Sequence, residues 1–344
     1  MTVPDPSSAA SPLRLLFWES TTRCNLACRH CRRLDTQANS DDLTPGEFRD
    51  VMESAATLGR PIVVFSGGEP LLRNDWEPLA VHATRLGLPA AMATNGTLID
   101  DPLADRIAAA RFHRVSVSLD GADAVTHDAF RGVDGAFRAA LDGIGRLRNR
   151  HVPLQINATV AAHNVHQLDA LYALAQTLEA AALHLFLLVP VGCGAQIGPR
   201  LQLPPDQYEQ VLLWICRRRQ AAGPKPPQLK ATCAPHYHRV ATQQGLAPRG
   251  RGCLCGSSVV FVSHQGEVFP CGYLPVSCGS VRQQSLADIW RTSIVLAQVR
   301  DPQRLEGACG ACNYKAVCGG CRARAYAAGG NYLVQEPSCI LGNS

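Results

Sequence analysis

Between residues 14 and about 190, short apolar runs alternate with longer stretches in which apolar residues recur at a helical period. The strand-like runs cover residues 15–18, 61–66, 90–94, 114–119, 154–160 and 183–189. Helical patterns occupy 45–58, 74–86, 102–110, 135–149 and 165–180. Strands that alternate with helices predict an α/β fold with a parallel sheet. Six such units fit a partial (β/α)6 barrel, whose functional site would lie at the C-terminal ends of the strands.

The first helical stretch has a clear start signal. Thr44 is placed to cap the helix, Pro45 occupies its first position, and Glu47 completes a capping box. After residue 200 the pattern loosens, and prolines interrupt it around one helix expected over 205–220. The pattern divides the chain into a disordered tail over 1–13, a barrel over 14–200, a bridge over 201–252 and a cysteine-rich domain over 253–344.

Fifteen cysteines in 344 residues suggest either a disulfide scaffold or metal binding. The N-terminus has no basic start and no apolar core typical of a secretory signal. We therefore expect a cytoplasmic protein with reduced thiols that serve as ligands. The net charge of +5 is too mild to indicate nucleic-acid binding. The most apolar segment, 170–191, includes charged and polar residues, so no membrane span is expected.

Cys24, Cys28 and Cys31 form a C-x3-C-x2-C run directly after the first predicted strand. Three thiolates on one loop would hold three irons of a four-iron cluster and leave the fourth iron open to an exchangeable ligand, whereas electron-transfer clusters usually have four cysteines. A structural zinc site is the alternative, although no convincing fourth ligand lies close by.

Polar and glycine-rich segments follow the next three strands. Gly67, Gly68, Glu69 and Pro70 follow the second strand, Asn95 the third, and Ser118 and Asp120 the fourth. Glycines allow a ligand to approach the backbone closely, but the same residue types also form ordinary turns. Both interpretations remain open from the residues alone.

A second group of cysteines lies near the C-terminus. Cys309, Cys312, Cys318 and Cys321 follow a C-x2-C-x5-C-x2-C pattern, with Cys339 downstream and with Cys253, Cys255 and Cys271 upstream. Four of these would suffice for a zinc ribbon, which is the alternative to iron–sulfur clusters.

Together these motifs resemble the radical S-adenosylmethionine (SAM) superfamily with a SPASM extension. The resemblance implies a TIM-like partial barrel and a 4Fe–4S cluster on Cys24, Cys28 and Cys31 whose open iron binds SAM. It implies SAM contacts from the second-strand segment, Asn95, Ser118, Asp120 and Arg131. It also implies one or two auxiliary 4Fe–4S clusters: Cys309, Cys312, Cys318 and Cys339 would bind one, and Cys253, Cys255, Cys271 and Cys321 a possible second. Many members have three residues between Cys318 and the next cysteine, where this chain has two.

Five segments are similar to heme b synthases of the siroheme-dependent pathway: LLFWE at 15–19, LVPVG at 188–192, KATCAPHY at 230–237, PCGYLP at 270–275 and CGGCRARAY at 318–326. Cys193 departs from that family, which is expected to have arginine there. The resemblance implies oxidative decarboxylation of two propionates of Fe-coproporphyrin III to vinyls. It also implies an iron-porphyrin substrate and a low-potential electron donor of the flavodoxin or ferredoxin type. Lys230, Cys233, His236 and Tyr237 are the candidate substrate contacts. Heme d1 maturases, didecarboxysiroheme-processing enzymes and peptide-modifying SPASM maturases are the alternatives.

Overall fold

The computed structural model describes residues 11–33, 41–247 and 250–342. The first ten residues of the predicted tail lie outside the described residues. At its other end, Leu13 is buried and its N–H donates to the carbonyl of Leu58. Leu13 therefore belongs to the packed core.

The described residues contain one ten-stranded sheet in the order β10-β9-β8-β1-β2-β3-β4-β5-β6-β7. The strands from β8 to β7 run parallel, and β8, β9 and β10 form an antiparallel meander. Their bounds are β1 Leu15–Glu19, β2 Ile62–Ser66, β3 Ala90–Thr94, β4 Arg114–Ser118, β5 Leu154–Val160, β6 Ala182–Leu187, β7 Gln228–Thr232, β8 Val259–Val262, β9 Glu267–Phe269 and β10 Gly279–Ser280.

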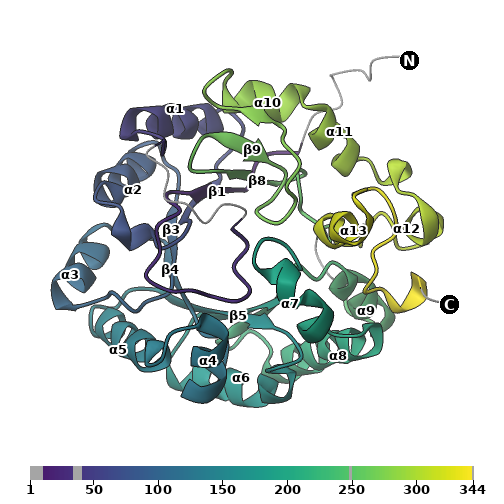
Figure 1. Ribbon diagram of the computed structural model, residues 1–344, viewed down its shortest axis with the longest axis horizontal. Helices are drawn as coiled ribbons and strands as arrows, with labels where there is room; N and C mark the ends of the chain where they lie inside the picture. The colour runs from purple at the N-terminus through teal and green to yellow at the C-terminus, as the bar shows by residue number, and fades with distance from the viewer. Residues whose placement is uncertain (1–10, 34–40, 248–249, 343–344) are drawn as a thin grey trace.

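Helices surround this curved sheet on its outside (Figure 1). Those of the barrel are α1 Pro45–Ala56, α2 Trp76–Arg85, α3 Asp101–Ala109, α4 Ala124–Arg131, α5 Ala136–Asn149, α6 Leu168–Thr177 and α7 Gly194–Leu201. Later helices are α8 Pro205–Ala222, α9 His236–Gln243, α10 Leu286–Thr292, α11 Ile294–Arg300, α12 Gly307–Ala311 and α13 Arg322–Gly329, and the short 3-10 turns are η1 Pro70–Leu72, η2 Val165–Gln167, η3 Pro302–Arg304 and η4 Ile340–Gly342.

Alternation along the strands decides which side chains pack against the helices. Trp18 of β1 stacks on Phe48 of α1 with ring centroids 3.5 Å apart, and Phe65 of β2 packs edge-on against Trp18. The capping box of α1 is present as predicted: Thr44 Oγ1 accepts from the Glu47 N–H, and the Glu47 carboxylate accepts from the Thr44 N–H. These apolar contacts place the core between sheet and helices, which leaves the inner face of the barrel for other chemistry.

All six predicted strands are present, within two residues at each end, and they form six consecutive parallel strands. The sheet is wider than the six strands predicted, because β7 extends one edge and β8, β9 and β10 extend the other. β8 belongs to the predicted cysteine-rich domain, yet it pairs directly with β1. Helices α4, α7 and α9 were also not predicted. Among the described residues, no helix combines the length and the apolar character needed to cross a membrane.

Candidate active site

The first cysteine loop, which carries Cys24, Cys28 and Cys31, leaves the C-terminal end of β1 and packs against the segment after β2. The Gly68 N–H donates to the carbonyl of Thr21 (2.7 Å), and the Glu69 N–H donates to that of Arg23 (2.8 Å). A Cβ atom on Gly68 would lie 2.1 Å from the Arg23 oxygen. Glycine is therefore required here because the backbone of the cysteine loop lies against it.

Glu69 is fully buried and holds the turn that follows β3. Its carboxylate accepts hydrogen bonds from Thr94 Oγ1 (2.7 Å) and from the Asn95 N–H (2.8 Å). Burial raises the pKa of Glu69 to about 7 despite these hydrogen bonds. The Asn95 side chain donates in turn to Asn25 in the cysteine loop at 2.8 Å. One buried carboxylate thus connects β2, β3 and the cysteine loop.

Asp120, just beyond Ser118 at the end of β4, is the second buried carboxylate at this end of the barrel. It forms an ion pair with Arg131 at 2.7 Å, and His30 Nε2 lies 3.3 Å from the same oxygen. Burial alone would raise the pKa of Asp120, but the Arg131 guanidinium lowers it overall. Arg131 also reaches the sulfur of Cys28 at 3.6 Å, so it joins this carboxylate to a thiol of the loop.

Three stacked rings hold the first cysteine loop in place. His30 lies over Phe130 with centroids 4.0 Å apart, and Phe130 lies over His163 at 3.9 Å. Desolvation lowers the pKa of His30 to about 4, so its imidazole is neutral near pH 7. The sequence does not indicate this stack, because Phe130 and His163 lie far from His30 in the chain.

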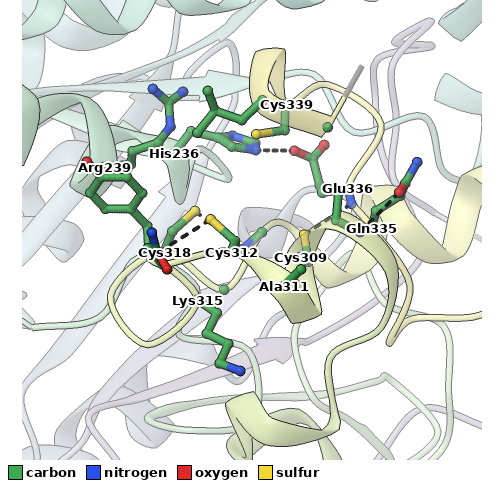
Figure 2. A pocket seen from close by; sticks show the side chains of 17 residues that line it. His236, Arg239, Cys309, Ala311, Cys312, Lys315, Cys318, Gln335, Glu336 and Cys339 are labelled. Carbon is green, nitrogen blue, oxygen red and sulfur yellow. Dashed lines mark hydrogen bonds and ion pairs between the residues drawn. The ribbon is translucent and has the colours of Figure 1, made fainter. Parts of the chain in front are cut away.

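Four cysteines line one cavity of ≈ 370 Å³: Cys309, Cys312, Cys318 and Cys339. We call this group site A. Figure 2 shows their sulfur atoms around the same hollow. Backbone N–H groups of Tyr314, Gly320 and Glu336 donate to the sulfurs of Cys312, Cys318 and Cys309 at 3.3, 3.5 and 3.4 Å. N–H donors directed at sulfur stabilise thiolates and tune iron–sulfur clusters, so these residues fit the auxiliary cluster that the sequence predicted.

A buried charged network supports site A. Glu336 is fully buried; it accepts from Arg324 Nε at 2.7 Å and forms an ion pair with His236, beside Cys339 (Figure 2). Burial would lower the pKa of His236, but the Glu336 carboxylate raises it to about 9. Although burial raises the pKa of Cys339, the hydrogen bond from His236 lowers it overall.

A second group of cysteines, which we call site B, packs with Val189, Leu274 and Ala323 in one cluster. Its members are Cys253, Cys255, Cys271 and Cys321. A hydrogen bond with Cys255 lowers the pKa of Cys253 to about 5 and lowers that of Cys271. Cys255 therefore contacts both Cys253 and Cys271, and Cys321 packs in the same cluster.

Neither site has the geometry of a single-ion centre. Across residues 11–33, 41–247 and 250–342, no three His, Cys, Asp or Glu side chains converge closely enough to hold one metal ion. Zinc holds all four thiolates about 2.3 Å from one ion, whereas a four-iron cluster binds each thiolate on a separate iron.

A second cavity of ≈ 150 Å³ lies between the first cysteine loop and site B. Thr22 and Arg32 line it on the side of the loop, and Cys271 and Tyr273 line it on the side of site B. The guanidinium of Arg32 lies 4.3 Å from the centre of the Phe261 ring. The cavity thus has a mixed lining of aromatic, polar and charged residues, and Cys271 of site B is the cysteine that lines it.

The candidate substrate residues do not lie together in this cavity. Lys230 is on the inner face of β7, and Cys233 packs against site B with a backbone φ of 53°. His236 is 1 % exposed and lies in the wall of site A. The Tyr237 hydroxyl accepts from Arg219 at 3.0 Å. Cys233 and His236 therefore contact the cysteine sites rather than the cavity beside the first loop.

Comparison with known proteins agrees with these features. Residues 18–175 match the family model for the radical SAM superfamily, and residues 253–313 match that for an iron–sulfur cluster-binding SPASM domain. The structure of Streptococcus suis SuiB bound to its precursor peptide SuiA has the same fold: its TM-score is 0.76 at 15% identity, covering 96% of this chain and 76% of that one.

Curated relatives match over nearly the whole chain. The AdoMet-dependent heme synthase of Methanosarcina barkeri is 44% identical, covering 95% of this chain and 96% of that protein. The AdoMet-dependent heme synthase of Nitratidesulfovibrio vulgaris is 41% identical, covering 95% and 92%. The chain therefore belongs to the AdoMet-dependent heme synthase family of radical SAM enzymes that carry a SPASM domain.

Proposed function

We propose that this protein removes two propionate carboxyl groups from Fe-coproporphyrin III and so forms the two vinyl groups of heme b. The observation that carries this proposal is the cavity between the first cysteine loop and site B. A substrate bound there would contact the SAM-binding loop on one side and a potential electron acceptor on the other. Phe261, Phe269 and Tyr273 in its wall offer ring faces to a flat macrocycle.

Cys24, Cys28 and Cys31 would hold a 4Fe–4S cluster whose open iron would bind SAM, and this group would supply the radical chemistry that removes one hydrogen atom from the propionate carbon next to the ring. The propionate then loses carbon dioxide and one electron as the carbon–carbon bond to the carboxyl group breaks and a vinyl double bond forms. Each vinyl group thus releases one hydrogen atom, one carbon dioxide and one electron.

Residues of the protein would position SAM, the first cysteine loop and the substrate. Glu69 offers a buried carboxylate for the ammonium group of SAM, and Asp120 with Arg131 holds the loop at Cys28. Tyr273 lines the cavity together with Arg32 and Cys271. We infer that site B accepts the released electron.

A low-potential flavodoxin or ferredoxin would supply the electron that SAM cleavage consumes. We propose the cytoplasm as the compartment, because thiols stay reduced there and remain available as cluster ligands. Anaerobic incubation of reconstituted protein with SAM, dithionite and Fe-coproporphyrin III, followed by mass spectrometry, tests the proposal. Loss of two carboxyl groups with deoxyadenosine formation is the expected result. Deoxyadenosine with unaltered porphyrin would refute the substrate and direct attention to the other tetrapyrroles or to peptides.

A further inference from the structure

Four polar side chains form a ladder across the inner face of β4 to β7, which we call the basic ladder: Arg114, Gln155, His184 and Lys230. Gln155 Nε2 lies 3.0 Å from His184 Nδ1, and Arg114 donates to Gln155 Oε1 at 3.5 Å. His184 and Lys230 are direct cross-strand partners. The four side chains therefore occupy neighbouring positions on one face of the sheet.

This face is the inside of the barrel. The residues that alternate with the ladder, including Val115, Ile156, Leu183 and Leu229, belong to the hydrophobic core. The helices that bury this core lie outside the strands (Figure 1). Because successive side chains of a strand point to opposite faces, the ladder points inward.

The ladder has two cations and no acid to balance them. Arg114 and Lys230 form no ion pair within the described parts of the chain. Desolvation and the charge of Arg114 lower the pKa of Lys230. Desolvation, Lys230 and Arg114 lower the pKa of His184 to about 3, which leaves it neutral. The neighbouring charges that lower the pKa values of His184 and Lys230 are thus positive.

Buried hydrogen-bonding atoms at the ladder are also left without partners. Arg114 Nε and, two residues beyond Lys230 on the same face, Thr232 Oγ1 are buried and make no hydrogen bond. Lys230 is exposed to solvent, because β7 is the edge strand of the sheet, whereas Arg114 is half-buried. A half-buried cation without a counter-ion, beside unsatisfied buried polar atoms, is costly unless an anion occupies the site.

We propose that Arg114, His184 and Lys230 bind the propionate carboxylates that the reaction leaves in place. Arg114 begins β4 and Ser118 ends it, so the ladder lies about 13 Å below the catalytic end of the barrel at the usual strand rise of about 3.3 Å per residue. A carboxylate bound at that depth is not the one from which hydrogen is abstracted. The inference rests on the proposed function, since it needs a substrate with several propionates.

At this subsite the substrate and the product would make the same contacts. Fe-coproporphyrin III and heme b share two propionates and differ only in the two that react. Lys230→Gln and Arg114→Gln should therefore weaken the binding of both porphyrins by a similar factor. We expect about tenfold for each variant, as for one charge-assisted hydrogen bond.

The test is a titration of the reconstituted full chain with Fe-coproporphyrin III and, separately, with heme b, followed by porphyrin absorption. Lys225→Gln and Arg138→Gln are matched controls, because both side chains are exposed and lie outside the barrel interior. Apparent Tm is a second readout: removing one of two mutually repelling cations should leave it unchanged or raise it.

Equal weakening for both porphyrins, with normal controls and no loss of Tm, supports the subsite. If Lys230→Gln and Arg114→Gln bind both porphyrins as tightly as the native protein does, the subsite is refuted and the proposed function is not. The subsite is also refuted if the variants bind Fe-coproporphyrin III more weakly but heme b normally, because the ladder would then hold a reacting propionate. Failure of the native protein to bind either porphyrin would overturn both the subsite and the proposed function.

Discussion

Gly68→Ala should disconnect the first cysteine loop from the barrel. The new Cβ would lie 2.1 Å from the Arg23 oxygen and 2.7 Å from the Thr22 oxygen, whereas ordinary contact begins near 3.4 Å. The loop backbone beside Cys24 must therefore move by about 1 Å, as it cannot relieve the overlap by rotating a side chain. The two backbone hydrogen bonds at Gly68 and Glu69 would be strained or lost.

The magnitude follows from these contacts. Overpacking against rigid backbone costs about 1–3 kcal/mol, and each lost hydrogen bond about 1 kcal/mol, so the folded state should be destabilised by about 3–5 kcal/mol. Apparent Tm should fall by on the order of 5–10 °C. Because the displaced carbonyl directly precedes Cys24, the loop should also bind its cluster poorly.

Iron and sulfide analysis after anaerobic reconstitution, together with deoxyadenosine production, measures this effect. Gly145→Ala is the matched control: this glycine lies in α5 with no other atoms within 4 Å of the added Cβ, and alanine is the better helix former by about 1 kcal/mol. The control should keep native iron content with equal or higher Tm. A Gly68→Ala protein with native iron, native Tm and native SAM cleavage would refute the reasoning.

Further expectations concern the cysteine sites and the buried carboxylates. Cys28→Ala should abolish deoxyadenosine formation, and persistent formation would contradict the assignment of the first loop. Replacing Cys309 and Cys312 with alanine should lower iron content yet leave uncoupled SAM cleavage; unchanged iron would argue against site A. SAM affinity should strengthen as pH rises through about 7, because only ionised Glu69 attracts the SAM ammonium group; Glu69→Gln should flatten this profile, and a pH-independent native affinity would contradict the role. Glu336→Gln should destabilise the fold by about 3 kcal/mol, because its buried cationic partners lose a carboxylate, and an unchanged Tm would refute this.

The strands and helices of the barrel could be predicted from the sequence, because each has its own local hydrophobic pattern. Residues 90–94 and 154–160 were predicted with the observed bounds, and the cap at Thr44 has the expected hydrogen bonds. The family resemblance grouped Cys309, Cys312, Cys318 and Cys339, and these four line one cavity; that they bind a cluster stays a prediction. Cys309, Cys312 and Cys318 are close in the chain, whereas Cys339 lies 21 residues further on and chain order alone does not select it.

The missed features depend on contacts between distant parts of the chain. The short apolar run of β8 has no local mark that distinguishes a sheet strand from a loop of a separate domain. Arg324 and Glu336 stand among cysteines, and nothing in their neighbourhood indicates that they form a buried pair. Cys233 and His236 stay predictions as substrate contacts; the sequence did not indicate that tertiary packing places both against the cysteine sites.

The pairing of β8 with β1 has a consequence for biosynthesis. Leu15 is hydrogen-bonded beside Val259, so the free edge of the first strand stays unprotected until some 250 later residues have left the ribosome. Parallel pairs with such large sequence separation form late, and open strand edges favour aggregation. The nascent barrel therefore depends on the last quarter of the chain to close it, and truncation before residue 259 would leave the strand that precedes the first cysteine loop as an exposed edge.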